Sequence, residues 1–201
     1  MKFAPVLLAV VMASPLLQGC VPVVAGGIAA GALAVDDRRT LGAQTEDRAI
    51  YVKAEGRLGE KLGGRSHINV TSFNRKVLLT GEVPDAAAKA EAEKIVGGVE
   101  NVISIVNELQ VAGASSLTAR TNDSILTGKV KGNMVDDPAL LANAFKVVTE
   151  AGVVYLMGLV TREEGERGSQ VAARTSGVKQ VVKVFEYIPV APRKAEEPAK
   201  K

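Results

Sequence analysis

The sequence predicts an α+β fold of two tandem units, each with the element order αββαβ and two helices packed on a three-stranded sheet. Three observations predict it. A stretch of alternating apolar and polar residues recurs after 77 residues. Turn residues interrupt both copies in the middle, which is typical of a β-hairpin. Apolar residues at helical spacing precede each copy.

The two hairpins are predicted over residues 68–83 and 145–160, with their turns at Asn74-Arg75 and Ala151-Gly152. Residues of the same kind occupy matching positions in the two copies: Ile68 and Phe145, Val70 and Val147, Val77 and Val154, Leu79 and Leu156, Gly81 and Gly158, Val83 and Val160. Because apolar and polar residues alternate, one face of each hairpin is expected to be buried.

A helix is predicted before each hairpin. Apolar residues recur there every four positions, at Ala54, Leu58 and Leu62 in the first copy and at Leu126, Val130 and Met134 in the second. Asn122 is a suitable N-cap for the second of these helices. The polar residues 36–47 are expected to form a connector that leads into the first.

A further helix is predicted after each hairpin, over residues 85–96 and 162–176. Both helices lead to a Gly-Val pair, at Gly98 and Gly177, where glycine can take the left-handed conformation that ends a helix. β-Branched residues then predict a third strand in each copy, at 102–109 and 181–188.

The N-terminal segment resembles the signal of a bacterial lipoprotein. Lys2 precedes an apolar run, Phe3 to Leu17, that is too short to span a bilayer. The run ends at Leu17-Gln18-Gly19-Cys20, which resembles a lipobox and contains the only cysteine. This resemblance implies cleavage before Cys20, a diacylglycerol thioether on its sulfur and a further acyl chain, such as palmitate, on the new N-terminus. The alternative is an ordinary signal peptide that a cysteine follows by chance.

These patterns divide the chain into six segments. They are a lipoprotein signal peptide at 1–19, a lipidated tether at 20–45, a first domain at 46–112, a linker at 113–120, a second domain at 121–189 and a disordered tail at 190–201. Since several acyl chains hold a protein firmly at a bilayer, we expect the mature chain to be anchored to the membrane, not to span it.

Composition argues against a nucleic-acid partner. Removing residues 1–19 takes away Lys2 and leaves 24 basic and 22 acidic residues, which are scattered along the chain. The chain has no Trp, three Tyr and four Phe, so it lacks the aromatic platforms on which bases stack.

We also expect no enzyme activity, no metal site and no cofactor besides the covalent lipid on Cys20. His67 is the only histidine, and no second type of ligand lies near it in the sequence. Glu163, Glu164 and Glu166 are interpreted as a solvated helix face. No thiol remains free for nucleophilic chemistry once Cys20 is acylated.

The helix predicted over 122–135 has an unusual outward face. At 100° per residue, Leu126, Val130 and Met134 cluster on one side. The opposite side holds Ile125, Gly128, Lys129, Gly132 and Val135, with Lys131 on the flank. Aliphatic, small and basic residues together suit insertion at a lipid interface. The alternative is an ordinary exposed face with an incidental Ile, because single exposed apolar residues are common.

Several motifs in order resemble tandem BON domains and, more closely, the DolP (YraP) family of dual-BON outer-membrane lipoproteins of Gram-negative bacteria. These motifs are an apolar-x-Gly-x-Val signature at Leu79–Val83 and Leu156–Val160, the connector residues Asp37-Arg38-Arg39-Thr40, Asn122-Asp123-Ser124 and Ser176-Gly177-Val178-Lys179. The resemblance covers the mature chain except its tail.

The resemblance implies binding of anionic phospholipid through the first helix of the second BON domain, a role in envelope integrity, enrichment at division sites and links to outer-membrane protein assembly. Val21 after Cys20 favours sorting to the outer membrane, where the chain would face the periplasm, with surface exposure left open. The family can carry a Trp where this chain has Ile125, which implies weaker binding or a shifted lipid preference.

Two classes of function follow. The first is a membrane-surface lipid binder that acts through the second domain. The second is an adaptor whose first domain, with nearly balanced charge, docks a protein of the assembly machinery. Glu55 and Glu60 make the first helix of that domain less attractive to anionic lipid.

Overall fold

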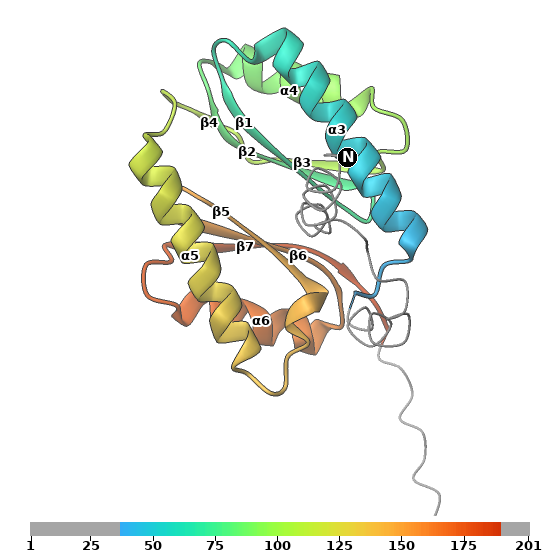
Figure 1. Ribbon diagram of the computed structural model, residues 1–201, viewed down its shortest axis with the longest axis vertical. Helices are drawn as coiled ribbons and strands as arrows, with labels where there is room; N and C mark the ends of the chain where they lie inside the picture. The colour runs from blue at the N-terminus through green and yellow to red at the C-terminus, as the bar shows by residue number, and fades with distance from the viewer. Residues whose placement is uncertain (1–36, 190–201) are drawn as a thin grey trace, which may run out of the picture. The chain divides into compact units, whose positions relative to one another are not determined.

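The computed structural model describes residues 37–189, which belong to one compact unit. The predictions for Cys20, for the tether up to residue 36 and for the tail at 190–201 lie outside the described residues. Within residues 37–189 the chain forms two repeats of the order αββαβ (Figure 1). The predicted α+β fold is therefore confirmed.

The first repeat places two helices on one mixed sheet. Its elements are α3 (Leu41–Leu62), β1 (His67–Phe73), β2 (Lys76–Val83), α4 (Ala86–Gly97), β3 (Ser104–Asn107) and β4 (Gln110–Val111). β1 is antiparallel to β2, and both β3 and β4 run parallel to β2. One continuous strand was predicted over 102–109; the structure instead interrupts it before β4, where the side chain of Leu109 turns into the core.

The second repeat has the same architecture with a three-stranded sheet. Its elements are α5 (Leu117–Val135), the short 3₁₀ helix η3 (Ala142–Ala144), β5 (Phe145–Glu150), β6 (Val153–Val160), α6 (Arg162–Arg174) and β7 (Gln180–Tyr187). β5 is antiparallel to β6, and β6 is parallel to β7. Register pairs Phe145 with Gly158, as it pairs Ile68 with Gly81 in the first repeat.

Both first helices begin earlier than the sequence predicts. Thr40 caps α3 by accepting a hydrogen bond from a backbone N–H, and Ser116 caps α5 in the same way. Asn122 is therefore not an N-cap, because α5 has already completed a turn when it reaches this residue. Ser, Thr and Asn are similarly effective caps, so composition alone does not select among them. Residues 41–45 and 117–120, expected in the tether and the linker, are helical.

The repeated glycine of the apolar-x-Gly-x-Val signature allows two strands to approach closely. A Cβ on Gly81 would collide with the carbonyl oxygen of His67, and one on Gly158 would collide with that of Ala144. Gly81 also has a φ of 111°, a conformation that side chains rarely adopt. The signature therefore contains glycine because a side chain at this position would collide with the backbone at the start of β1 or just before β5.

The glycines that follow the second helices behave differently from each other. Gly177 has a φ of 101°, as predicted for a left-handed residue beyond the end of a helix. Gly98 has a φ of −84°, so the prediction of a left-handed residue is wrong there. Its N–H instead bonds to carbonyls of the last turn of α4, which closes that helix without a left-handed residue.

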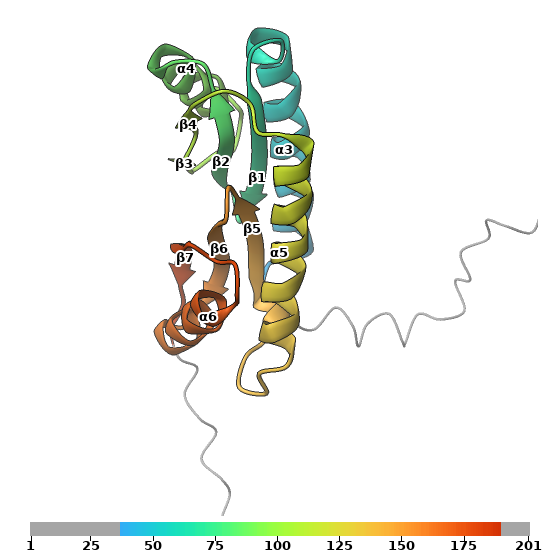
Figure 2. The same ribbon diagram turned by 90° about the vertical axis from the view of Figure 1, so that its left-hand side faces the viewer.

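Each sheet is covered on both of its faces. The helices of each repeat pack on one face of their own sheet and enclose a separate apolar core. A third cluster joins the opposite faces of the two sheets, and its buried members are Phe73, Leu78, Tyr155, Met157 and Val184. Figure 2 shows the two sheets lying between the helices of the two repeats. Every residue of β2 after Lys76 is consequently buried.

A buried aspartate on the first helix of each repeat holds the hairpin turn. Asp47 accepts hydrogen bonds from the backbone N–H groups of Asn74 and Arg75, each at 2.7 Å. Asp123 accepts from Ala151 and Gly152 at 2.9 and 2.8 Å. All four turn residues have positive φ, as the tight turns of hairpins require. We call these contacts the aspartate–turn contacts.

Two arginines attach the connector, residues 37–40, to both repeats. Arg38 binds both carboxylate oxygens of Glu164 on α6, at 2.8 and 2.7 Å, and donates to the carbonyl of Leu159. Arg39 binds Asp47 on α3 at 2.8 Å and stacks over the ring of Phe73. Glu164, which was interpreted as part of a solvated face, is therefore held by a bidentate ion pair.

The Arg38 guanidinium holds the pKa of Glu164 at about 2, well below its ordinary value of 4.5, and the backbone N–H of Thr161 contributes. Because the folded-state pKa is lowered, the resulting stability is present above the unfolded pKa and is lost as the pH falls toward 2. Glu164 thus supports the fold across the neutral range.

The aspartate–turn contacts predict a large loss of stability on truncation. Asp123→Ala removes two charge-assisted hydrogen bonds and leaves two buried N–H groups without their acceptor, so we expect a loss of about 2–3 kcal/mol in the free energy of unfolding. Asp136→Ala, at the exposed end of the same helix, should change stability by about 0.5 kcal/mol or less. Thermal melts compare the two; equal melting temperatures would contradict the role given to Asp123.

The Arg38–Glu164 pair predicts a pH-dependent difference between the parent and Glu164→Gln. Above about pH 5 the variant should be less stable by on the order of 2 kcal/mol, since the pair is partly exposed to solvent. This difference should shrink toward zero as the pH approaches 2. Glu166→Gln, which breaks only the exposed Glu166–Lys183 pair, is the matched control. A difference that does not vary with pH would show that the charge of Glu164 is not what stabilises the fold.

Candidate functional site

The outward face of α5 presents the residues that the sequence predicts for membrane contact. Ile125, Gly128, Lys129, Lys131, Gly132 and Val135 are all exposed. On the opposite side, Leu126, Val130 and Met134 are buried in the core of the second repeat. Ile125 is 53% exposed and Leu126 is 8% exposed, so the predicted rotation of the helix is confirmed.

The exposed apolar stripe is longer than predicted. Since α5 begins at Leu117, that residue joins Ile125 and Val135 on the same side, 79% exposed. At about 1.5 Å per residue the stripe extends for about 27 Å along the helix. Apart from the backbone of α5 and the adjacent residues, no atom lies within 4 Å of a Cβ built on Gly128 or Gly132, so the middle of the stripe is open to solvent. The sequence did not indicate Leu117 because the helix start was placed at Asn122.

A groove runs beside α5 at the level of Ile125. It has a volume of about 490 Å³, and Ile125 and Lys129 line it from the helix. From the other side it is lined by Gly177 and Lys179 and by the turn at Ala151-Gly152. Lys179 donates to the carbonyl of Ala151 at 2.8 Å, which holds its ammonium group at the edge of the groove. The groove therefore combines an aliphatic wall with two cations.

Lys131 on α5 also lies near positive charges of other elements. Desolvation by neighbouring protein lowers the pKa of Lys146 on β5, and the nearby charges of Lys131 and Arg39 lower it further. Within residues 37–189, neither Lys129 nor Lys131 forms an ion pair. An anion at this surface would relieve repulsion among cations without first displacing an acidic partner.

The corresponding helix of the first repeat differs in charge. On α3, Lys53 pairs with Glu100 at 2.7 Å, and Arg57 donates to the carbonyl of Gly98 at 2.6 Å. Glu55 and Glu60 are exposed on the same helix, as the sequence led us to expect. Two of the cations on α3, Lys53 and Arg57, are thus engaged, whereas Lys129 and Lys131 on α5 have no such partner in residues 37–189.

His67 lies in an acidic environment that the sequence did not indicate. Its Nδ1 is 3.0 Å from a carboxylate oxygen of Glu82, its cross-strand partner, and Glu150 of the second repeat lies close by. Burial raises the pKa of Glu150, and the negative charge of Glu82 raises it further. The hydrogen bond from Asn69 lowers this pKa and so opposes both effects. The three residues are far apart in the sequence, which explains why His67 was expected to have no second ligand type nearby.

None of the helices described between residues 37 and 189 is both long enough and apolar enough to cross a bilayer. Of the predicted site residues, Cys20 is outside the described range, and the other six lie together on α5.

Comparison with known proteins identifies both repeats. The BON domain family matches residues 52–113 and 122–189. The outer membrane lipoprotein DolP of Haemophilus influenzae is 38% identical over 174 residues, covering 86% of this chain and 90% of that protein. A 21 kDa hemolysin of Actinobacillus pleuropneumoniae is 30% identical, over 76% of this chain and 79% of that protein.

A third relative is similar over a shorter part of the chain. The osmotically inducible protein Y of Escherichia coli is 31% identical over 140 residues, covering 68% of this chain and 70% of that protein. With two matches to one domain family and high coverage of DolP, the chain belongs to the BON-domain family and, within it, to the dual-BON outer-membrane lipoproteins of the DolP family.

Proposed function

We propose that this chain is a non-enzymatic lipoprotein of the outer membrane that binds anionic phospholipid through α5 and supports envelope integrity at division sites. The observation that carries the proposal is the exposed stripe of Leu117, Ile125 and Val135 beside the cations Lys129 and Lys131. Amphipathic helices of this kind lie in the plane of the interface, with aliphatic groups among the acyl chains and cations at the headgroups.

The groove beside Ile125 supports a specific arrangement of the lipid. Lys129 lines the groove from α5 and Lys179 lines it from the other side, so an anionic headgroup binds between two cations while Ile125 contacts the acyl chains. Phosphate oxygens accept hydrogen bonds from ammonium groups, and such charge-assisted contacts are stronger than neutral ones. The lack of a Trp at position 125 leaves the aliphatic contact without the preference of an aromatic ring for the headgroup level.

An adaptor role for the first repeat is the second candidate, and one surface feature favours it. A groove of about 620 Å³ lies between α3 and α4. Ile95 lines it together with charged residues of both signs, which are Arg57, Glu60, Lys61, Glu91 and Lys94. Mixed charge of this kind suits a polar protein segment better than an anionic membrane. A protein of the outer-membrane assembly machinery is the partner that the family suggests.

Liposome binding separates the two candidates. Ile125→Glu puts a negative charge where an aliphatic group should meet acyl chains, so binding to vesicles with anionic lipid should fall by at least about tenfold. Val52→Glu is the matched control, because Val52 on α3 is 54% exposed, nearly the same as Ile125. Co-sedimentation and a thermal melt are measured for each variant, and both should retain the parent's melting temperature within a few degrees. If the two variants lose binding equally, α5 is not the membrane surface and the adaptor role gains support.

A double variant tests whether the charges of Lys129 and Lys131 contribute to the binding of anionic lipid. Lys129→Glu combined with Lys131→Glu should weaken binding by about 1 kcal/mol or more for each cation reversed, and high salt should reduce the difference from the parent. Replacing anionic lipid by a zwitterionic lipid should have the same effect on the parent. A salt-independent loss would indicate a change in folding instead.

The anchor is tested at Cys20. Cys20→Ala should abolish incorporation of labelled palmitate and leave an uncleaved or released form of the chain, because the sequence has no other thiol on which the thioether can form. Ile125→Glu should keep normal labelling, which distinguishes the covalent anchor from the lipid-binding helix. Normal labelling of Cys20→Ala would contradict the lipobox assignment.

A further inference from the structure

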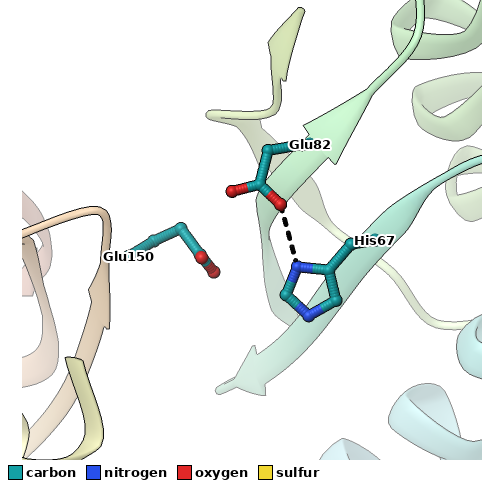
Figure 3. A group of neighbouring side chains, drawn as sticks. All are labelled: His67, Glu82 and Glu150. Carbon is teal, nitrogen blue, oxygen red and sulfur yellow. Dashed lines mark hydrogen bonds and ion pairs between the residues drawn. The ribbon is translucent and has the colours of Figure 1, made fainter. Parts of the chain in front are cut away.

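The cluster of His67, Glu82 and Glu150 joins the two repeats. His67 and Glu82 are directly opposite each other on the paired strands β1 and β2. Glu150 closes β5 of the other repeat, immediately before the turn that Asp123 holds. Figure 3 shows the carboxylate of Glu150 directed toward the His67–Glu82 pair across the space between the repeats.

The donor atoms are close enough for one small cation. One ligand atom from each residue lies within 4.8 Å of the other two, and the His67–Glu82 distance is 3.0 Å. Ligands of a tetrahedral zinc ion with bonds of about 2.0–2.2 Å are separated by about 3.3–3.6 Å. Small side-chain rotations would therefore bring all three donors to coordinating distance.

Burial makes a cation at this place favourable. Glu82 and Glu150 are each only 6% exposed, and among residues 37–189 Glu150 forms no ion pair. Its one hydrogen bond is donated by Asn69, at 2.8 Å, and Glu82 accepts from the backbone N–H of Ser115 at 3.1 Å. Two buried carboxylates so near each other need positive charge, and the imidazole of His67 is a metal donor when it is neutral.

The surroundings leave room for an ion with water. A pocket of about 180 Å³ adjoins the cluster and is lined by His67, Asn69, Thr149 and Glu150, and on α5 by Arg120, Asp123 and Ser124. A water needs about 10–15 Å³ of such space, so the volume can hold water molecules that complete the coordination. Arg120 donates to the hydroxyl of Ser115, and Asp123 is engaged by the turn, so neither supplies charge to the cluster through a direct bond.

We propose that His67, Glu82 and Glu150 bind one divalent transition-metal ion, with Zn²⁺ as the preferred ion, and that this ion links the two BON repeats. One imidazole nitrogen and two carboxylates form a donor set that zinc accepts in proteins, with water in the fourth position. Mg²⁺ prefers six oxygen donors and does not suit this site. Because the ligands come from both repeats, the ion would stabilise their packing against each other.

The test uses the full chain in detergent, treated with a chelator and then titrated with ZnCl₂ or MgCl₂. Calorimetry should give one zinc ion per chain. A concentration of 100 times Kd should raise the melting temperature by about 5–10 °C. Substitution by Co²⁺ should produce visible absorption bands of a nitrogen- and oxygen-ligated ion, which reports coordination independently of stability. MgCl₂ should leave the melting temperature unchanged.

Glu150→Gln and His67→Gln each remove one ligand and should weaken zinc binding by at least about 100-fold, since changes outside the first coordination shell already cost about 10–100-fold. Glu186→Gln is the matched control. Glu186 also accepts a hydrogen bond across the repeats, from Asn74 at 2.8 Å, but has no histidine beside it. This variant should bind zinc as the parent does.

Three results would overturn the proposal. The first is no saturable zinc binding by the parent. The second is binding that survives both ligand substitutions, which would place the ion elsewhere on the chain. The third is that metal-free Glu150→Gln melts at a higher temperature than the metal-free parent, while zinc does not change the melting temperature of the parent. That result would mean that a proton, not a metal ion, neutralises the negative charge of the cluster. If a ligand variant fails to fold, the Co²⁺ spectrum of the parent still decides: intense bands of a four-coordinate ion support the site, and the weak bands of six-coordinate aqueous Co²⁺ would overturn it.

Discussion

Neither repeat can bury both faces of its central strand by itself, and the rest of the structure depends on this constraint. Two helices cover one face of each sheet, while the other face carries large apolar side chains such as Leu78 and Met157, which are fully buried only against the opposite repeat. Burial of apolar surface stabilises a fold in proportion to the area removed from water. The pairing of two similar repeats is therefore part of the core, and the helices remain outside, where α5 can present a surface.

Polar contacts at the edges of this apolar interface determine how the repeats are aligned. Asn74 reaches Glu186, Lys76 reaches the carbonyl of Phe185, and Asn69 reaches Glu150. The connector adds a further constraint, because Arg38 binds α6 while the adjacent Arg39 binds α3. Hydrogen bonds are directional, so they specify one alignment of two faces that apolar packing alone would hold less selectively.

Local patterns in the sequence were sufficient to predict most of the helices and strands and the outward face of α5. The alternation of apolar and polar residues around Asn74-Arg75 and Ala151-Gly152 predicts both hairpins. The helical period of 3.6 residues predicts that Ile125 faces outward and Leu126 faces the core. The starts of α3 and α5 were misplaced because Thr40, Ser116 and Asn122 are comparable caps. Asp47, Asp123 and the His67 cluster were not predicted as sites, because the turn residues that the aspartates hold and the residues of the cluster lie between 15 and 83 residues apart, and only the tertiary fold brings them together.

The same fold supports different surfaces on its two first helices, and the difference arises from neighbouring charges. Exposed apolar residues occur on both, with Val52 on α3 and Ile125 on α5 at nearly equal exposure. What distinguishes them is that Lys53 and Arg57 on α3 are engaged by Glu100 and a helix-end carbonyl, whereas Lys129 and Lys131 have no acidic partner in the described part of the chain. A cation already paired gains little from a phosphate, because it must give up one anion to bind another. Free cations beside an apolar stripe gain the full interaction, so membrane affinity in this architecture should follow the pairing of surface lysines more closely than their number.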